Sequence, residues 1–103
     1  MIIDAFNTNY GYKAFTISAA ETNLNIKTTY PDLWAFAQEA RYCKITTDKT
    51  ITVRFNAVTN SAIQITSTES PRVWTRSDQS MIISNIFITN PTVTTAITIE
   101  LYQ

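Results

Sequence analysis

The sequence predicts a mainly β protein, either an antiparallel β-sandwich or a jelly-roll-like fold, with one short helix. From Thr46 onward, segments of alternating apolar and polar residues recur at intervals of about ten residues, which is typical of an antiparallel sandwich. Ile and Thr are abundant and Gly11 is the one glycine, and β-branched side chains pack well on a pleated sheet. A chain of 103 residues fits one domain, 1–103, which buries roughly 65% of its unfolded surface.

The N-terminal part of the chain contains one clear strand pattern. Residues 1–10 are expected to form a short strand or an arm, and residues 7–11 concentrate side chains that favour a turn. Alternation begins again at Tyr12 and continues to Ser18. We therefore expect a strand over residues 12–18.

The apolar spacing changes between Thr29 and Tyr42, which predicts the helix. Apolar residues recur there three and four positions apart, at Leu33, Phe36, Ala37 and Ala40. Pro31 suits a first helical turn, and Asp32 complements the positive end of the helix dipole. A helix of about three turns is unstable alone in water, so it needs the sheet as a packing partner. We expect it to cap one end of the sandwich, with Trp34 in the core.

The C-terminal third carries the strongest strand pattern and almost no charge. Residues 79–99 contain no Asp, Glu, Lys or Arg. Alternation places Val93, Thr95, Ile97, Ile99 and Leu101 on one face of the last strand, and Thr94, Ala96, Thr98 and Glu100 on the other. The second face is thus polar but nearly uncharged, which favours contact with another protein. Thr94 and Thr98 are our candidate interface residues.

A second candidate site is the segment Arg72-Val73-Trp74-Thr75-Arg76, where alternation places Arg72, Trp74 and Arg76 on one strand face. Two interpretations are open. If this face is inward, Trp74 is a core residue. If it is exposed, Trp and Arg are common energetic anchors of interfaces, and the indole face can stack on a sugar ring. Burying two arginines with Trp74 would be costly, which keeps the second interpretation open.

Residue types that commonly carry out catalysis or bind metals and phosphates are scarce in this sequence, so we expect no catalytic residues, no cofactor and no metal site. The chain has no histidine, and its acidic residues are scattered singly. Cys43 is the one cysteine and has no Cys or His partner for zinc, so a buried structural thiol is favoured over a reactive nucleophile. One glycine is too few for a phosphate-binding loop.

Charge and hydropathy exclude two further classes of partner. Eight basic and eight acidic residues give a formal net charge of zero, so no electrostatic surface for nucleic acid or an anionic membrane is predicted.

The N-terminal residues have no basic start and no apolar run of signal length. The expected compartment of synthesis is therefore the cytoplasm.

The second half of the chain resembles small β-sandwich structural proteins of tailed bacteriophages. The resemblance covers residues 51–102, through the segments ITVRFN (51–56), AIQI (62–65), MIISNIFITN (81–90) and TAITIEL (95–101). It implies a non-enzymatic viral structural protein of the virion, such as a capsid decoration or cement protein, a head-fibre base or a small tail or neck subunit. The implied partners are copies of itself, in a homo-oligomer, and other virion proteins such as a major capsid protein. The alternative is a carbohydrate- or host-surface-binding module that uses Trp74 and its flanking arginines.

Overall fold

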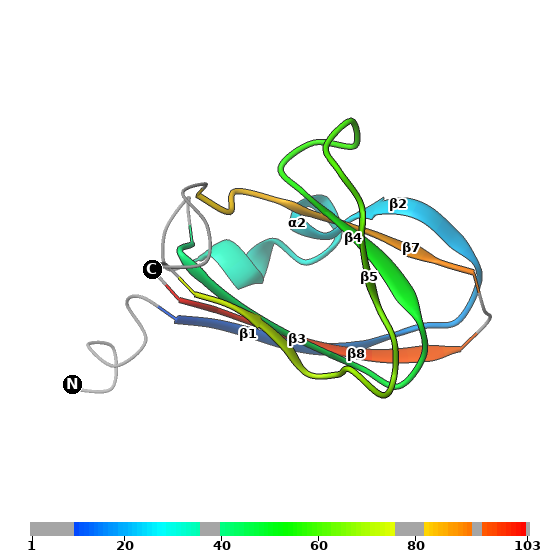
Figure 1. Cartoon of the computed structure of the whole chain (residues 1–103). Helices are drawn as coiled ribbons and strands as arrows, with labels where there is room; N and C mark the ends of the chain where they lie inside the picture. Colours follow the sequence, from blue (N-terminus) through cyan, green and yellow to red (C-terminus); the bar gives the residue numbers. More distant parts are fainter. Residues whose placement is uncertain (1–9, 36–39, 76–81, 92–93, 103) are drawn as a thin grey trace.

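The protein is a sandwich of two four-stranded antiparallel sheets (Figure 1). The computed structural model describes residues 10–35, 40–75, 82–91 and 94–102. Within these ranges the strands are β1 (Tyr10–Ile17), β2 (Glu21–Asn25), β3 (Tyr42–Thr47), β4 (Ile51–Phe55), β5 (Ile63–Ile65), β6 (Arg72–Trp74), β7 (Ile86–Asn90) and β8 (Thr95–Tyr102). The mainly β class predicted from the alternating segments is confirmed.

The strand order is that of a jelly roll. One sheet has the order β1-β8-β3-β6, and the other has the order β2-β7-β4-β5. The first strand pairs with the last, the second with the seventh, the third with the sixth and the fourth with the fifth, all antiparallel. This nesting is what results when one long hairpin of eight strands is rolled up into two Greek keys.

The core lies between the two sheets and follows the alternation of the sequence. In β8 the side chains of Thr95, Ile97, Ile99 and Leu101 are buried, whereas the intervening ones lie outside. The other strands contribute inward residues in the same way, among them Ile45, Ile51, Val53, Ile65, Ile86 and Ile88. Removing this apolar surface from water is the main driving force for folding.

The helical segment is shorter than predicted and lies earlier in the chain. It consists of α2 (Ile26–Thr29), one turn whose N-cap side chain accepts a hydrogen bond from the Thr28 amide, and η1 (Pro31–Trp34), a 3-10 turn. The prediction of a continuous helix from Thr29 to Tyr42 is wrong, because Ala40 forms a β-bridge with Ile83 and Tyr42 begins β3. Residues 36–39 lie outside the described ranges.

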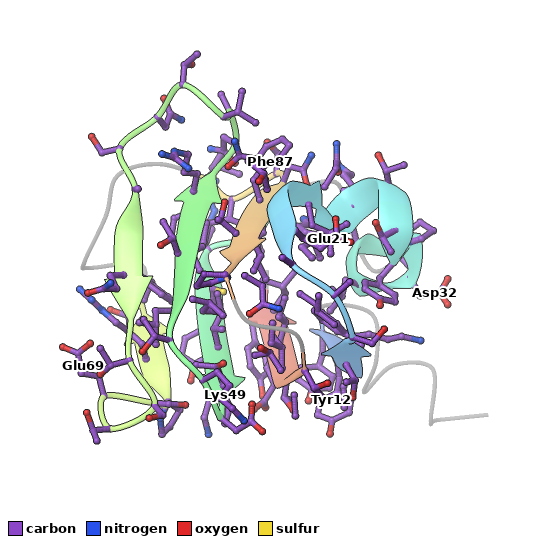
Figure 2. All side chains as sticks on the ribbon, turned by 90° about the vertical axis from the view of Figure 1, so that its right-hand side faces the viewer. Tyr12, Glu21, Asp32, Lys49, Glu69 and Phe87 are labelled. Atoms are coloured by element: carbon purple, nitrogen blue, oxygen red, sulfur yellow. The ribbon has the colours of Figure 1, made fainter. Side chains whose placement is uncertain are left out.

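The α2-η1 segment closes the side of the sandwich where β1 and β2 are the edge strands (Figure 2). Ile26, Leu33 and Trp34 are buried there, so the predicted core position of Trp34 is confirmed. The Trp34 Nε1 group donates a hydrogen bond to the Ile83 carbonyl oxygen at 3.3 Å. The sequence predicts that the helix caps one end of the sandwich. In the structure the α2-η1 segment instead closes one of its sides.

The N-terminal strand begins earlier than the pattern predicted. Tyr10 and Gly11, which were assigned to a turn, are part of β1, and Gly11 is buried. The expected strand or arm over residues 1–10 lies outside the described residues except for Tyr10. Tyr10 is paired with Tyr102, so both ends of the described chain lie at one end of the same sheet (Figure 1).

Candidate functional site

Thr98 and Thr94, the predicted interface residues, both lie outside the core. Thr98 is a half-buried residue on the outward side of β8, and Thr94 is exposed just before this strand. Thr98 is level with Ala14 of β1 and Thr46 of β3. The structure therefore places Thr98 near the middle of the outer face of the β1-β8-β3-β6 sheet.

Trp74 belongs to the interior, which corresponds to the packing interpretation of its strand. Its side chain is 8% exposed, and its ring meets Phe55 of the opposite sheet edge-on, with ring centroids 5.0 Å apart. The Arg72 guanidinium lies 5.5 Å from the Trp74 ring centroid and remains exposed, which avoids the cost of burying its charge. Arg76 lies outside the described residues. No open indole face is left for stacking on a ligand.

The outer face of the β1-β8-β3-β6 sheet is the surface that best fits contact with another molecule. We call it the β8 face. Twelve described residues point outward from its strands: Tyr10, Tyr12, Ala14, Thr16, Tyr42, Lys44, Thr46, Val73, Ala96, Thr98, Glu100 and Tyr102. Among the described residues no segment covers this face, which is the lower layer of Figure 1. Its composition is rich in Tyr and Thr, and tyrosine is enriched at protein interfaces.

Three tyrosines form a row across one end of the β8 face. Tyr10, Tyr102 and Tyr42 are level on β1, β8 and β3. The ring centroids of Tyr10 and Tyr102 are 4.6 Å apart, and those of Tyr42 and Tyr102 are 4.8 Å apart with the rings nearly perpendicular. Such contacts hold the rings in fixed positions, so binding at this row would cost little side-chain entropy.

The chemistry of the Tyr10 hydroxyl depends on its neighbours. It donates a hydrogen bond of 3.4 Å to the Glu100 carboxylate. Burial, the Glu100 charge and Tyr102 together raise the pKa of Tyr10 to about 12 from its ordinary 10.0, because each of them disfavours a phenolate. Tyr10 therefore acts as a neutral donor at physiological pH.

The next row of the β8 face contains its two charges. Tyr12, Glu100, Lys44 and Val73 are level on the four strands, in this spatial order. The Lys44 ammonium lies 3.8 Å from the Glu100 carboxylate, so the two charges neutralise each other. Tyr12 is 55% exposed and Val73 is 40% exposed, which makes them two of the most exposed large apolar residues of the described chain. The row thus reads apolar, acidic, basic, apolar.

The opposite outer face, on β2-β7-β4-β5, is engaged in its own polar contacts. Phe87 lies on this face, far from Tyr12 (Figure 2). The Arg54 guanidinium donates to Asn23 Oδ1 at 2.9 Å, and the backbone N–H of Asn23 donates to Thr89 Oγ1 at 3.0 Å. These contacts connect three strands of the sheet, so the polar side chains here have a structural role.

Asparagines hold the loops at one end of the molecule. Asn56, with a φ of 71°, accepts hydrogen bonds from the amides of Ser84 and Asn85 and donates to the Ile82 carbonyl oxygen. Asn85 Nδ2 in turn donates to Asn25 Oδ1, the same oxygen that caps α2. These asparagine side chains form hydrogen bonds with backbone groups that have no partner in a neighbouring strand, so their role is structural.

The described part of the chain contains no cluster of chemically reactive groups. No three His, Cys, Asp or Glu side chains come together there in a way that would hold a metal ion. Cys43 is fully buried, opposite Leu101 and Trp74, and burial raises the pKa of its thiol. A thiol kept protonated and away from solvent is a weak nucleophile. No described helix is long and apolar enough to span a membrane.

The alternation of the last strand predicted that Thr98 faces outward, but it did not indicate which residues surround Thr98. Tyr10 and Tyr12 have the spacing of one strand face, and Lys44 and Glu100 have the parity of outward positions. Which residues share a row depends on the pairing of β1, β8, β3 and β6, which are far apart in sequence. No family model matches the chain, and no curated protein does either.

Proposed function

We propose that this protein is a non-enzymatic structural protein of a bacteriophage particle, a capsid decoration or cement protein or a related head or tail component. It assembles through uncharged β surfaces with copies of itself and with other virion proteins, such as a major capsid protein. The observation that carries the proposal is the β8 face, where Tyr, Thr and Ala surround one neutralised pair of charges. Depletion of charge with enrichment in tyrosine is the composition of an interface core.

Two further points support the proposal. The resemblance to small phage β-sandwich proteins includes β4, β7 and β8, which are interior strands of the two sheets, and the edge strand β5. Jelly rolls occur in viral capsid proteins, although they also occur in lectins and cupins, so the fold alone does not decide between them. An assembly role requires no active site, and the residues of the β8 face suffice for it.

The experiment that tests the proposal places a charge on the uncharged face. Replacing Thr98 by Lys inserts an ammonium near the middle of the β8 face, and its desolvation opposes assembly. We expect Thr98→Lys to fold as the wild type does and to weaken self-association by about tenfold or more. Thr94→Lys, at the margin of the face, should have the smaller effect. Sedimentation velocity across a concentration series measures both, and unchanged association of Thr98→Lys would contradict the proposal.

The second candidate function is a carbohydrate- or host-surface-binding module. It is favoured by the exposed rings of Tyr12 and Tyr102 beside Glu100, because aromatic faces and charged hydrogen-bonding groups together suit a sugar. Trp74 is too buried to serve this function. A glycan screen of the wild type and of Tyr12→Ser tests this candidate: a ligand that binds only the wild type supports it, and absence of binding to both removes it.

A further inference from the structure

The level row on the β8 face is symmetric in its chemistry. Tyr12 on β1 and Val73 on β6 lie at its two ends, and Glu100 on β8 and Lys44 on β3 lie at its centre. The apolar groups are thus placed symmetrically about the line midway between the neighbouring strands β8 and β3. The two charges of opposite sign lie on either side of this line. A surface with this arrangement is complementary to itself.

We propose that the β8 face binds the same face of a second copy of this chain, through a twofold axis that runs parallel to the strands between β8 and β3. This inference rests on the assembly role proposed above and names its partner and geometry. The axis exchanges β8 with β3 and β1 with β6. A homodimer with one self-complementary patch is the commonest symmetric assembly.

The pairings across this axis follow from the strand register. Glu100 of each copy meets Lys44 of the other, and Tyr12 meets Val73. In the neighbouring rows, Tyr102 meets Tyr42 and Thr98 meets Thr46. Each of these pairs places like with like or charge with opposite charge. Any other lateral shift would place Lys44 or Glu100 against an apolar residue, at a cost in desolvation.

Exposure favours the same occupant. The exposed large apolar residues of the described chain are Tyr12, Val58, Val73 and Tyr102, and all but Val58 belong to the β8 face. Sheets pack face to face at about 10 Å, with their strands within about 30° of parallel. A second sheet at this distance would cover Tyr12, Val73 and Tyr102 at once. Four ion-pairing groups, two from each copy, would then fix the lateral register and exclude partners of one sign of charge.

The test uses two variants, each of which reverses one charge of the Lys44–Glu100 pair. Lys44→Glu places two carboxylates on each face, and Glu100→Lys places two ammonium groups there, so neither variant should dimerise with itself. Mixed in equal amounts, the two should form a one-to-one heterodimer, because each charge then meets its opposite. Both variants should fold, since a surface ion pair contributes little to stability. Light scattering gives the mass, and native mass spectrometry gives the composition of the dimer.

A matched control separates the interface from attraction by net charge. Glu21→Lys changes the net charge as Glu100→Lys does, but Glu21 begins β2 in the other sheet. Because Glu21→Lys keeps the wild-type β8 face, it should dimerise with itself, and it should pair with Lys44→Glu far less than Glu100→Lys does. Tyr12→Ser should weaken wild-type dimerisation by about tenfold or more. Val58→Ser, at another exposed apolar residue but in the β4-β5 connection, should leave it unchanged.

The outcomes distinguish this interface from the proposed function. An oligomeric wild type whose two charge variants still self-associate, or whose mixture forms no heterodimer, would overturn the interface and leave the assembly role standing. As much heterodimer in the control mixture as in the mixture of Lys44→Glu with Glu100→Lys would overturn it as well, since net charge would then explain the association. A wild type that is monomeric at every concentration would overturn both the interface and self-assembly.

Discussion

At the scale of single residues, the aromatic side chains divide between the interior and the β8 face. Trp34 is buried on the side of the sandwich that the α2-η1 segment closes, and Trp74 is buried on the edge strand β6 of the opposite side, whereas Tyr12 and Tyr102 remain exposed. An indole contributes a large apolar area to a core, and a phenol combines an apolar ring with a hydroxyl that tolerates water. The residues that contribute most to stability are therefore different from those available for binding.

Trp74 provides a test of this division. Trp74→Ala removes the ring that packs edge-on against Phe55 and leaves a cavity between the sheets, so it should lower the free energy of unfolding by about 3–5 kcal/mol. Trp74→Phe keeps a ring at this place and should cost less. Urea denaturation measures both, with the exposed Val58→Ala as the control, which should stay within about 0.5 kcal/mol. A Trp74→Ala variant as stable as the control would contradict the core assignment.

The raised pKa of Tyr10 predicts that the folded protein loses stability at alkaline pH. Its pKa is raised from 10.0 to about 12 in the folded protein, so between these values the unfolded chain releases the proton while the folded chain retains it. The unfolded state is thereby favoured, and the stability that is present below pH 10 falls as the pH rises toward 12.

The measurement is the urea midpoint as a function of pH, for the wild type and Tyr10→Phe. The phenylalanine variant lacks the titrating hydroxyl and should lose less stability over this pH interval. Equal alkaline losses in the two proteins would show that Tyr10 titrates normally. Ultraviolet absorbance of the phenolate gives an independent titration of the folded protein.

At the scale of elements, the strands were predictable and the helical segment was not. In β4, β7 and β8 the alternation alone separates buried from outward residues, because both neighbours of each strand are other strands of the same sheet. Between Leu33 and Ala40 the apolar spacing resembled one helical stripe. Its two described members are buried for different reasons: Leu33 lies on a 3-10 turn, and Ala40 forms a bridge to Ile83. The bridge depends on a contact distant in sequence.

Leu33 tests how much the α2-η1 segment contributes. Its side chain is fully buried where this segment closes the sandwich, so Leu33→Ala should lower the free energy of unfolding by about 2–5 kcal/mol. The neighbouring Asp32 is exposed, and Asp32→Ala should have an effect below about 0.5 kcal/mol. Thermal and urea denaturation compare the two. A small effect of Leu33→Ala would mean that the segment packs only loosely on the sheets.

At the scale of the whole molecule, the jelly-roll topology creates the candidate surface. Nesting the first strand against the last and the third against the sixth brings Tyr12, Glu100, Lys44 and Val73 into one level row. The sequence identified the uncharged face of the last strand, with Thr98, but its neighbours come from three other strands. Their register follows from long-range pairing, which local patterns do not specify.

The light-scattering mass of the wild-type protein over a concentration series tests assembly through the β8 face most directly. We predict a mass of twice the 11.7 kDa of the chain, or a higher even multiple, that falls toward the monomer on dilution and in the Thr98→Lys variant. A mass of one chain at every concentration would contradict self-assembly. An oligomer that Thr98→Lys leaves intact would place the interface elsewhere on the molecule.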